Sequence, residues 1–133
     1  RTLIAADAEE VRKLFFENLP EGAQVHTGAS VTLDTLGITV AEDGRVIVAS
    51  RSGSQLGLYV SGAGKVIWVV GAQKIVSELD EAFRRIDEYS YPLEDARMYE
   101  TYNAHSSVNK ILIVQREAPG RITVVLVREE LGF

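Results

Sequence analysis

The spacing of apolar and polar residues along the chain predicts alternating strands and helices. Five runs of β-branched and other apolar residues have strand length and predict buried strands; they are Ile38–Val40, Val46–Val48, Lys65–Val70, Lys110–Gln115 and Ile122–Val127. Asp43 and Gly44 separate the first two runs, and an Asp-Gly pair between strand-forming flanks predicts a hairpin. A turn at Pro119–Arg121 separates the last two runs, which are also predicted to pair as a hairpin.

Apolar residues at helical spacing predict helices between these strands. One amphipathic helix is expected over Asp7–Asn18 and a second over Glu78–Tyr89, where Ser77 is the predicted N-cap. Pro92 is expected to break the second helix, so that a separate, more polar helix follows over Leu93–Tyr102. Strands that are apolar on both faces need helices to cover them. The pattern therefore predicts the α/β class, with a mixed sheet flanked by helices in three layers.

Length and composition agree with a single domain spanning residues 1–133. The chain has 133 residues, of which 46% are hydrophobic and 25% are charged, as in an ordinary globular domain. Its net charge of −5 argues against nucleic acid or an anionic membrane as a broad electrostatic partner. No apolar run approaches the ~20 residues of a membrane span, and a cytoplasmic location is expected.

The sequence offers little for metal or cofactor chemistry. The absence of cysteine excludes disulfides, thiolate nucleophiles and the thiolate ligands of an iron–sulfur cluster. His26 and His105 stand in no metal-ligand spacing such as HExxH, so no metal site and no cofactor on this chain are predicted. The Gly62–Lys65 segment superficially resembles a nucleotide-binding loop, but Tyr59 stands where that motif requires its first glycine. The segment is interpreted as a turn that leads into the next strand.

Glycine- and serine-rich turns near predicted strand ends are the candidate sites. Glycine permits positive φ, and hydroxyl and backbone N–H groups in such turns can hold a phosphate or carboxylate. Open α/β sheets also bind ligands at the carboxyl ends of their strands. The residues predicted to bind a small anionic ligand are Gly28, Ser30, Ser52, Gly53, Ser54, Gln55, Lys74, His105, Asn109 and Lys110. The simpler alternative is that these turns serve only the fold.

Three segments together resemble one known family. They are GSQLGLYVSGAGKVIWVVGAQKIVSELDEAFRRI, HSSVNKILIVQRE and the terminal GRITVVLVREELGF, and the similarity covers roughly Pro20 to Phe133. The family is the lactate-utilisation (LUD) domain family, and the chain resembles its lactate utilisation protein C type. The resemblance implies a fold similar to the sugar-phosphate isomerase and CoA-transferase superfamily. It also implies a subunit that acts with separate iron–sulfur proteins in the oxidation of L-lactate to pyruvate, and it carries over no catalytic residue.

The chain departs from the family pattern in one place. Family members have a longer segment between a motif like Ser30–Asp34 and a strand like Val46–Ser50, whereas here Gly37–Val40 joins the two almost directly. A segment near residues 37–41 is therefore either deleted or left out of the sequence. Long mobile loops near sites are often lids, so a missing loop would take part of the ligand site with it.

Three functions are compatible with these observations. The first is a lactate-utilisation subunit or paralogue that binds a small anionic metabolite, with Lys74 or Lys110 supplying charge to the anion. The second is a non-catalytic interaction subunit for an iron–sulfur partner, in which the glycine turns serve only the fold. The third is a stand-alone enzyme for a phosphorylated or CoA-linked substrate, which rests only on analogy between folds.

Overall fold

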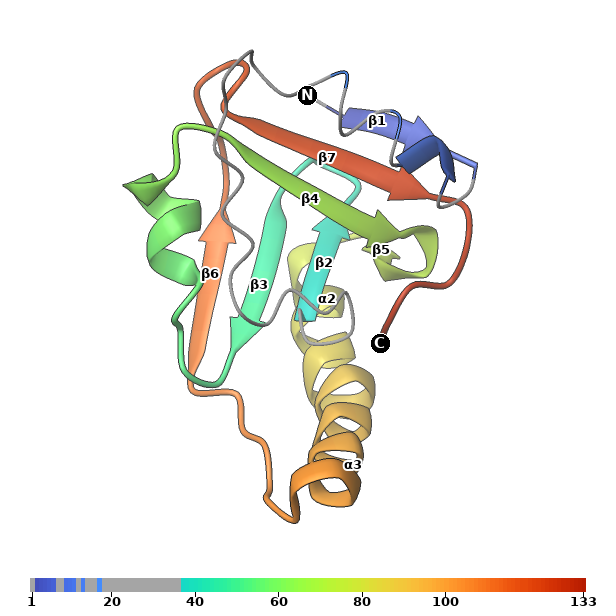
Figure 1. The fold of residues 1–133 in the computed structure, drawn as a ribbon, viewed down its shortest axis with the longest axis vertical. Helices are drawn as coiled ribbons and strands as arrows, with labels where there is room; N and C mark the ends of the chain where they lie inside the picture. The colour runs from blue at the N-terminus through green and yellow to red at the C-terminus, as the bar shows by residue number, and fades with distance from the viewer. Residues whose placement is uncertain (1, 7–8, 12, 14–16, 18–36) are drawn as a thin grey trace.

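In the computed structural model, the described residues (2–6, 9–11, 13, 17 and 37–133) form an α/β protein with two sheets. One sheet has the strand order β1-β7-β4 and the other the order β5-β2-β3-β6 (Figure 1). The strands are β1 (Thr2–Ala5), β2 (Gly37–Ala41), β3 (Val46–Ser50), β4 (Val66–Gly71), β5 (Ile75–Val76), β6 (Lys110–Val114) and β7 (Ile122–Val127). The helical segments are η1 (Leu58–Gly62), η2 (Ala72–Lys74), α2 (Leu79–Arg85), η3 (Ile86–Ser90) and α3 (Tyr91–Tyr102).

The α/β class predicted from the sequence is confirmed, and its strands are divided between two sheets that pack face to face. The strands of one sheet cross steeply over those of the other (Figure 1). One apolar layer fills the space between the sheets; its buried members are Ile38, Val46, Val48, Val66, Trp68, Val70, Ile122 and Val124. Two sheets arise because β4 and β7 are apolar on both faces and pair in parallel, whereas β2, β3 and β6 form an antiparallel set.

The outer face of each sheet has an apolar cover of its own. On the outer face of the β5-β2-β3-β6 sheet, Ile47 and Ala49 pack against Ala82 of α2 and Ile86 of η3. On the outer face of the β1-β7-β4 sheet, the buried residues Ala5, Val125 and Val127 pack against partly buried apolar side chains that include Val11 and Leu131. Both sheets are therefore covered on both faces, as a sheet of apolar strands requires.

The predicted Asp-Gly hairpin is confirmed. β2 and β3 pair antiparallel, and the Gly44 N–H donates to the Ala41 carbonyl over 2.9 Å. Gly44 has a φ of 90°, a conformation that a side chain would strain. The Asp43 carboxylate accepts hydrogen bonds from the N–H and the Nε of Arg45, at 3.0 and 2.7 Å, and so closes the turn.

The predicted hairpin between Lys110–Gln115 and Ile122–Val127 is wrong. β6 pairs antiparallel with β3, whereas β7 lies in the other sheet, parallel to both β1 and β4. Burial explains the separation. β7 is buried at five of its six residues, so it needs strand neighbours on both edges and cover on both faces, whereas no residue of β6 is fully buried. A run of apolar residues shows that a strand forms and does not identify its partner.

The helix that follows β5 begins close to the predicted residue. Glu78 is the N-cap of α2, so Ser77 lies one position before it. The N–H and the hydroxyl of Ser77 donate to Glu81 Oε2 over 2.8 and 2.6 Å. These two bonds, the hydroxyl one foremost, lower the pKa of Glu81.

Pro92 does not break the helix as predicted. α2, η3 and α3 follow one another without a gap and form one long rod (Figure 1). η3 is a π-helical turn in which the Tyr91 N–H reaches back to the Ile86 carbonyl. Pro92 lies in the first turn of α3, directly after the widened turn, and the rod continues through it. Among the described helices, none is long and apolar enough to cross a bilayer.

Replacing Ile47 by alanine tests the packing of β3 against the helical layer. Ile47 is fully buried, so we expect Ile47→Ala to lower the free energy of unfolding by about 2–5 kcal/mol. Ile111→Ala in β6 is the matched control, because Ile111 is 42% exposed and should cost less than about 1 kcal/mol. Urea denaturation followed by circular dichroism measures both. Equal losses in the two variants would contradict the arrangement.

Candidate functional site

Two of the predicted site segments, Ser52–Gln55 and Asn109–Lys110, lie side by side where β3 ends and β6 begins. Ser50 is the register partner of Lys110, and the Asn109 N–H donates to the Ser50 carbonyl over 3.2 Å. The Ser50 hydroxyl in turn accepts the Gly53 N–H at 2.9 Å. The loop after β3 is thus fixed against the first residues of β6.

Gly53 allows the Lys110 side chain to lie directly over this loop. Its φ is +77°, and a Cβ at this position would overlap Lys110 Cδ and lie 3.2 Å from Cε. A glycine is needed here for both reasons, since a side chain would strain the backbone and displace the lysine stem. Lys110 itself is exposed, so its ammonium group is presented to solvent beside the loop.

Two serine hydroxyls lie in the same loop. The Ser52 hydroxyl donates to Ser54 Oγ at 3.1 Å and accepts the Ser54 N–H at 3.3 Å, and the Ser54 hydroxyl donates to Gln55 Oε1 at 3.2 Å. Arg51, also exposed, directly precedes them. We call the group Arg51–Ser54 with Lys110 the basic corner.

The basic corner has the chemistry of an anion site. Ammonium and guanidinium groups hold carboxylates and phosphates in proteins, and the Ser52 and Ser54 hydroxyls can join them by rotating away from their present partners. Among the described residues, no carboxylate forms a hydrogen bond or ion pair with the Arg51 or Lys110 side chain. Both cations are therefore available to an external anion.

Lys74 and the Gly71 turn lie at the opposite end of the β5-β2-β3-β6 sheet. Lys74 precedes Ile75, which pairs with Val40, whereas Lys110 pairs with Ser50 at the far end of β3. Lys74 is level with Ile47, three residues from Ser50, so the two lysines are separated by about 10 Å along the strands and by further strand spacings across the sheet. Lys74 is also only 3% exposed. The structure therefore does not bring Lys74 to the basic corner.

The Gly71 turn binds the C-terminal segment of the chain. Gln73 Nε2 donates to the carbonyls of Leu131 and Gly132, both at 3.1 Å. A Cβ on Gly71 would overlap the Gln73 side chain and lie 2.7 Å from the Leu131 nitrogen. This close approach gives Gly71 a packing role. Gly28 and Ser30 lie outside the described residues, so their share in a site stays a prediction.

His105 pairs with Asp95, which is not among the predicted site residues. Its Nδ1 lies 3.0 Å from Asp95 Oδ2, and its ring stacks on Tyr99 with centroids 5.1 Å apart. Asp95 also accepts the Ser106 N–H at 2.6 Å, and the contacts with His105 and Ser106 lower its pKa. Asp95 thereby ties α3 to the loop that leads into β6. No spacing rule predicts a pair between residues ten positions apart across a helix end.

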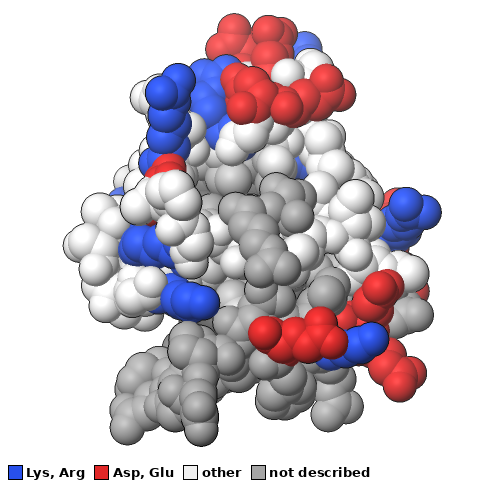
Figure 2. Space-filling view, turned by 90° about the horizontal axis from the view of Figure 1, so that it is seen from above, with Lys and Arg blue, Asp and Glu red and all other residues white. Residues whose placement is uncertain are grey.

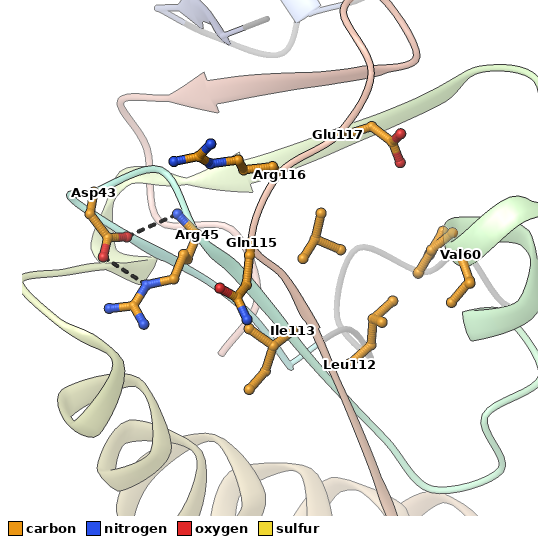
Figure 3. Close-up of a pocket in the computed structure, with 10 residues that line it drawn as sticks. Asp43, Arg45, Val60, Leu112, Ile113, Gln115, Arg116 and Glu117 are labelled. Carbon is orange, nitrogen blue, oxygen red and sulfur yellow. Dashed lines mark hydrogen bonds and ion pairs between the residues drawn. The ribbon is translucent and has the colours of Figure 1, made fainter.

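A groove beside β6 is a second feature that the sequence did not predict. Its volume is about 700 Å³, and its walls are Leu112–Glu117, the turn at Asp43 and Arg45, and Tyr59 and Val60 of η1. Figure 3 shows side chains from these segments around one space, with the Asp43–Arg45 pair at one side and Val60 across from it. The volume lies in the range of ligand pockets.

Arg121 fixes the η1 wall of this groove. Its Nε donates to the Ala63 carbonyl at 3.1 Å, and its Nη2 donates to the Leu58 and Tyr59 carbonyls at 3.2 and 2.8 Å. Its Nη1 pairs with Glu117. These bonds pair the guanidinium with the first two carbonyls of η1 and with the carbonyl of the residue after it. Arg121 thus ties η1 to the start of β7.

Tyr59 connects the groove to the layer between the sheets. Its ring packs edge-to-face on Trp68, with centroids 5.3 Å apart and planes at 87°. Burial raises the pKa of Tyr59, which keeps its phenol protonated in neutral solution. The Tyr59 side chain therefore carries no charge where it lines the groove.

Comparison with known proteins gives one match. The family model of the LUD domain matches residues 37–127, which span β2 to β7 and include the basic corner and the groove. No curated protein and no solved structure matches the chain.

The glycine requirement at the basic corner can be tested by alanine substitution. Gly53→Ala forces an alanine into a left-handed conformation and should lower the free energy of unfolding by about 1–2 kcal/mol. Gly57→Ala is the matched control, because a Cβ there meets nothing within 4 Å and the backbone is already helical. It should change stability by less than about 1 kcal/mol, in the stabilising direction. Urea unfolding measures both variants, and similar losses would refute the requirement.

The Asp95 contacts predict a pH dependence of stability. The folded-state pKa of Asp95 lies below its ordinary value of 3.8, so its ionised form stabilises the fold above that value. This contribution is lost as the pH falls through the folded pKa. The stability difference between the wild type and Asp95→Asn should therefore shrink as the pH falls below about 4. Asp87→Asn, at an exposed position in η3, is the control, and a difference for Asp95→Asn that does not change with pH would contradict the prediction.

Proposed function

Because the chain belongs to the LUD domain family, we propose that it is a subunit or paralogue of the system that oxidises L-lactate to pyruvate, and that it binds a small anionic metabolite at the basic corner. Lactate and pyruvate are small carboxylates, which match the donors of that corner. The family match supports the link to lactate utilisation. The superfamily implied by resemblance, the protein C type and a cytoplasmic location remain parts of this proposal.

One observation carries the choice of site. The Lys110 stem packs on Gly53, and this contact presents an exposed ammonium group beside the Ser52 and Ser54 hydroxyls. A carboxylate needs such a cluster of donors on one side and open access on the other. Several of the predicted site residues lie together at this end of the sheet, namely Ser52–Gln55, Asn109 and Lys110. Their proximity supports a site here.

The electrons of the proposed reaction need a second protein. Oxidation of L-lactate to pyruvate releases two electrons and two protons, and this chain has no cysteine thiolate to ligate an iron–sulfur cluster. We therefore propose that separate iron–sulfur subunits accept the electrons. The chain would contribute by binding and orienting the carboxylate.

Surface charge supports a small metabolite over nucleic acid. On the face drawn in Figure 2, acidic and basic side chains of the described residues form separate small clusters, and no single basic surface covers the face. The chain also has a net charge of −5. Binding to a polyanion without sequence specificity needs a continuous basic surface.

A non-catalytic interaction subunit is the second candidate, and α3 favours it. This helix has no buried residue, and Tyr99 and Tyr102 are 52% and 64% exposed. Exposed aromatic side chains on an uncovered helix are a common feature of protein interfaces. An iron–sulfur subunit that packs on α3 would make the chain a docking partner with no small ligand of its own.

Replacing the donors of the basic corner tests the first function. Ser54→Ala/Lys110→Gln removes one hydroxyl and one cation, so we expect the dissociation constant for L-lactate or pyruvate to rise about tenfold or more. Isothermal titration calorimetry measures the constant. Ser61→Ala/Lys65→Gln, at exposed positions outside the corner, is the matched control and should bind as the wild type does.

The outcome separates the two candidates. Wild-type binding that the double substitution weakens, with unchanged circular dichroism, supports the metabolite site. Wild-type binding that the double substitution leaves unchanged would mean that the ligand sits elsewhere. If neither acid binds the wild type at millimolar concentration, the interaction subunit becomes the better interpretation.

A further inference from the structure

β6 is an edge strand. It pairs with β3 along its whole length, from Ser50↔Lys110 to Val46↔Val114, and it ends the strand order β5-β2-β3-β6. Alternate residues of an edge strand point their backbone N–H and C=O groups away from the sheet, and no described strand pairs with this edge of β6. Ile111 in this strand is also 42% exposed. The strand therefore has both the backbone groups and the apolar surface to pair further.

The groove lies beside this free edge and not on one face of the sheet. Successive residues of a strand point to opposite faces. Leu112 and Val114 pack against the layer between the sheets, whereas Ile113 packs against the helical layer. The groove touches every residue from Leu112 to Glu117, so it contacts both faces of the strand at once. A space alongside the edge of β6 accounts for this lining. Six residues give it a length of about 20 Å.

The groove is also lined by η1. Its far side is formed by η1, where Val60 is 58% exposed and Tyr59 is anchored on Trp68. The Arg121 hydrogen bonds hold η1 in that place. A wall on this side hinders the approach of a whole second sheet, so we infer that the occupant is a single extended segment.

The charges around the groove are unbalanced. Its two carboxylates are already paired, Asp43 with Arg45 and Glu117 with Arg121. Arg116, by contrast, makes no hydrogen bond or ion pair with any described residue. In Figure 3 the Arg116 side chain extends toward the side of the groove where Asp43 and Arg45 lie, away from Val60. The occupant that complements this charge carries a carboxylate.

We propose that the β6 edge binds an extended peptide segment of a partner protein, which adds a strand to the sheet. Strand addition uses backbone hydrogen bonds for affinity and alternate side chains for specificity. The apolar walls favour β-branched side chains along the segment, and Arg116 favours an acidic residue near one end. This site is separate from the basic corner and does not depend on the proposed metabolite.

A second copy of the chain fits the groove less well. It would bring its own β6, with Lys110 and Arg116 at the two ends, and both of its groove carboxylates are already paired. In an antiparallel pairing centred on Ile113, these two cations would face each other across the strands, which is destabilising. A partner segment that carries free carboxylates meets no such repulsion.

Fluorescence anisotropy with a defined peptide tests the proposal. The probe is a fluorescein-labelled octapeptide of alternating valine and threonine with a glutamate at each end, titrated with the full chain. We expect saturable binding below about 1 mM. Arg116→Glu should weaken it at least tenfold, whereas Arg84→Glu on α2 makes the same charge change at an exposed position outside the groove and should have no effect. Circular dichroism and the melting temperature verify that both variants fold.

Two further probes identify the mode of binding. The same peptide N-methylated at alternate residues loses the donors of one edge, so its affinity should fall at least tenfold if a strand is added. The peptide with lysine at each end should bind at least tenfold more weakly than the glutamate peptide. In hydrogen exchange, added peptide should protect backbone amides of β6.

Three results would overturn the proposal. The first is that the glutamate peptide shows no binding at about 1 mM, which is roughly the weakest dissociation constant that the assay detects. The second is equal binding of the N-methylated peptide, which would reduce the interaction to surface charge. The third is that the chain self-associates in analytical ultracentrifugation and that Val60→Asp abolishes this association. That result would mean that a second copy of the chain occupies the groove. None of these results depends on whether the basic corner binds a metabolite.

Discussion

The apolar layer between the two sheets is the constraint on which the rest of the structure depends. Trp68 lies at its centre, buried to 2% exposure, and side chains from β2, β3, β4 and β7 pack around it. Removing such surface from water is the main favourable contribution to folding. Strands from both sheets meet in this layer, so it holds the two sheets together, and the β3–β6 register within one of them sets where those strands meet.

The proposed anion site follows from that arrangement. Residues 50 to 54 and residue 110 are far apart in the sequence, and the β3–β6 pairing makes them neighbours. A glycine with positive φ then lets the Lys110 stem cross the loop, which sets its ammonium group near two hydroxyls. The donors of the corner are ordinary residues, and only their convergence gives them the chemistry of an anion site.

The groove beside β6 depends on the same layer through a different contact. Tyr59 packs edge-to-face on Trp68, and Arg121 binds the carbonyls of Leu58 and Tyr59, the first two residues of η1. Together they hold a short helical turn opposite an edge strand. η1 has no buried residue of its own, so without these anchors its position would not be determined. The same two contacts therefore support the fold and shape a space in which a further strand fits.

The sequence by itself determined the α/β class, the β-strand runs and the Asp43–Gly44 hairpin, because these depend on residues close together in the chain. The family match over residues 37–127 also came from sequence. The tertiary structure decided which strands pair, since apolar runs such as Lys110–Val114 and Ile122–Val127 are alike in pattern and differ only in how deeply the fold buries them. It also separated Lys74 from Lys110, joined Asp95 to His105 and opened the groove. Those relations depend on contacts across the fold, which no local spacing encodes.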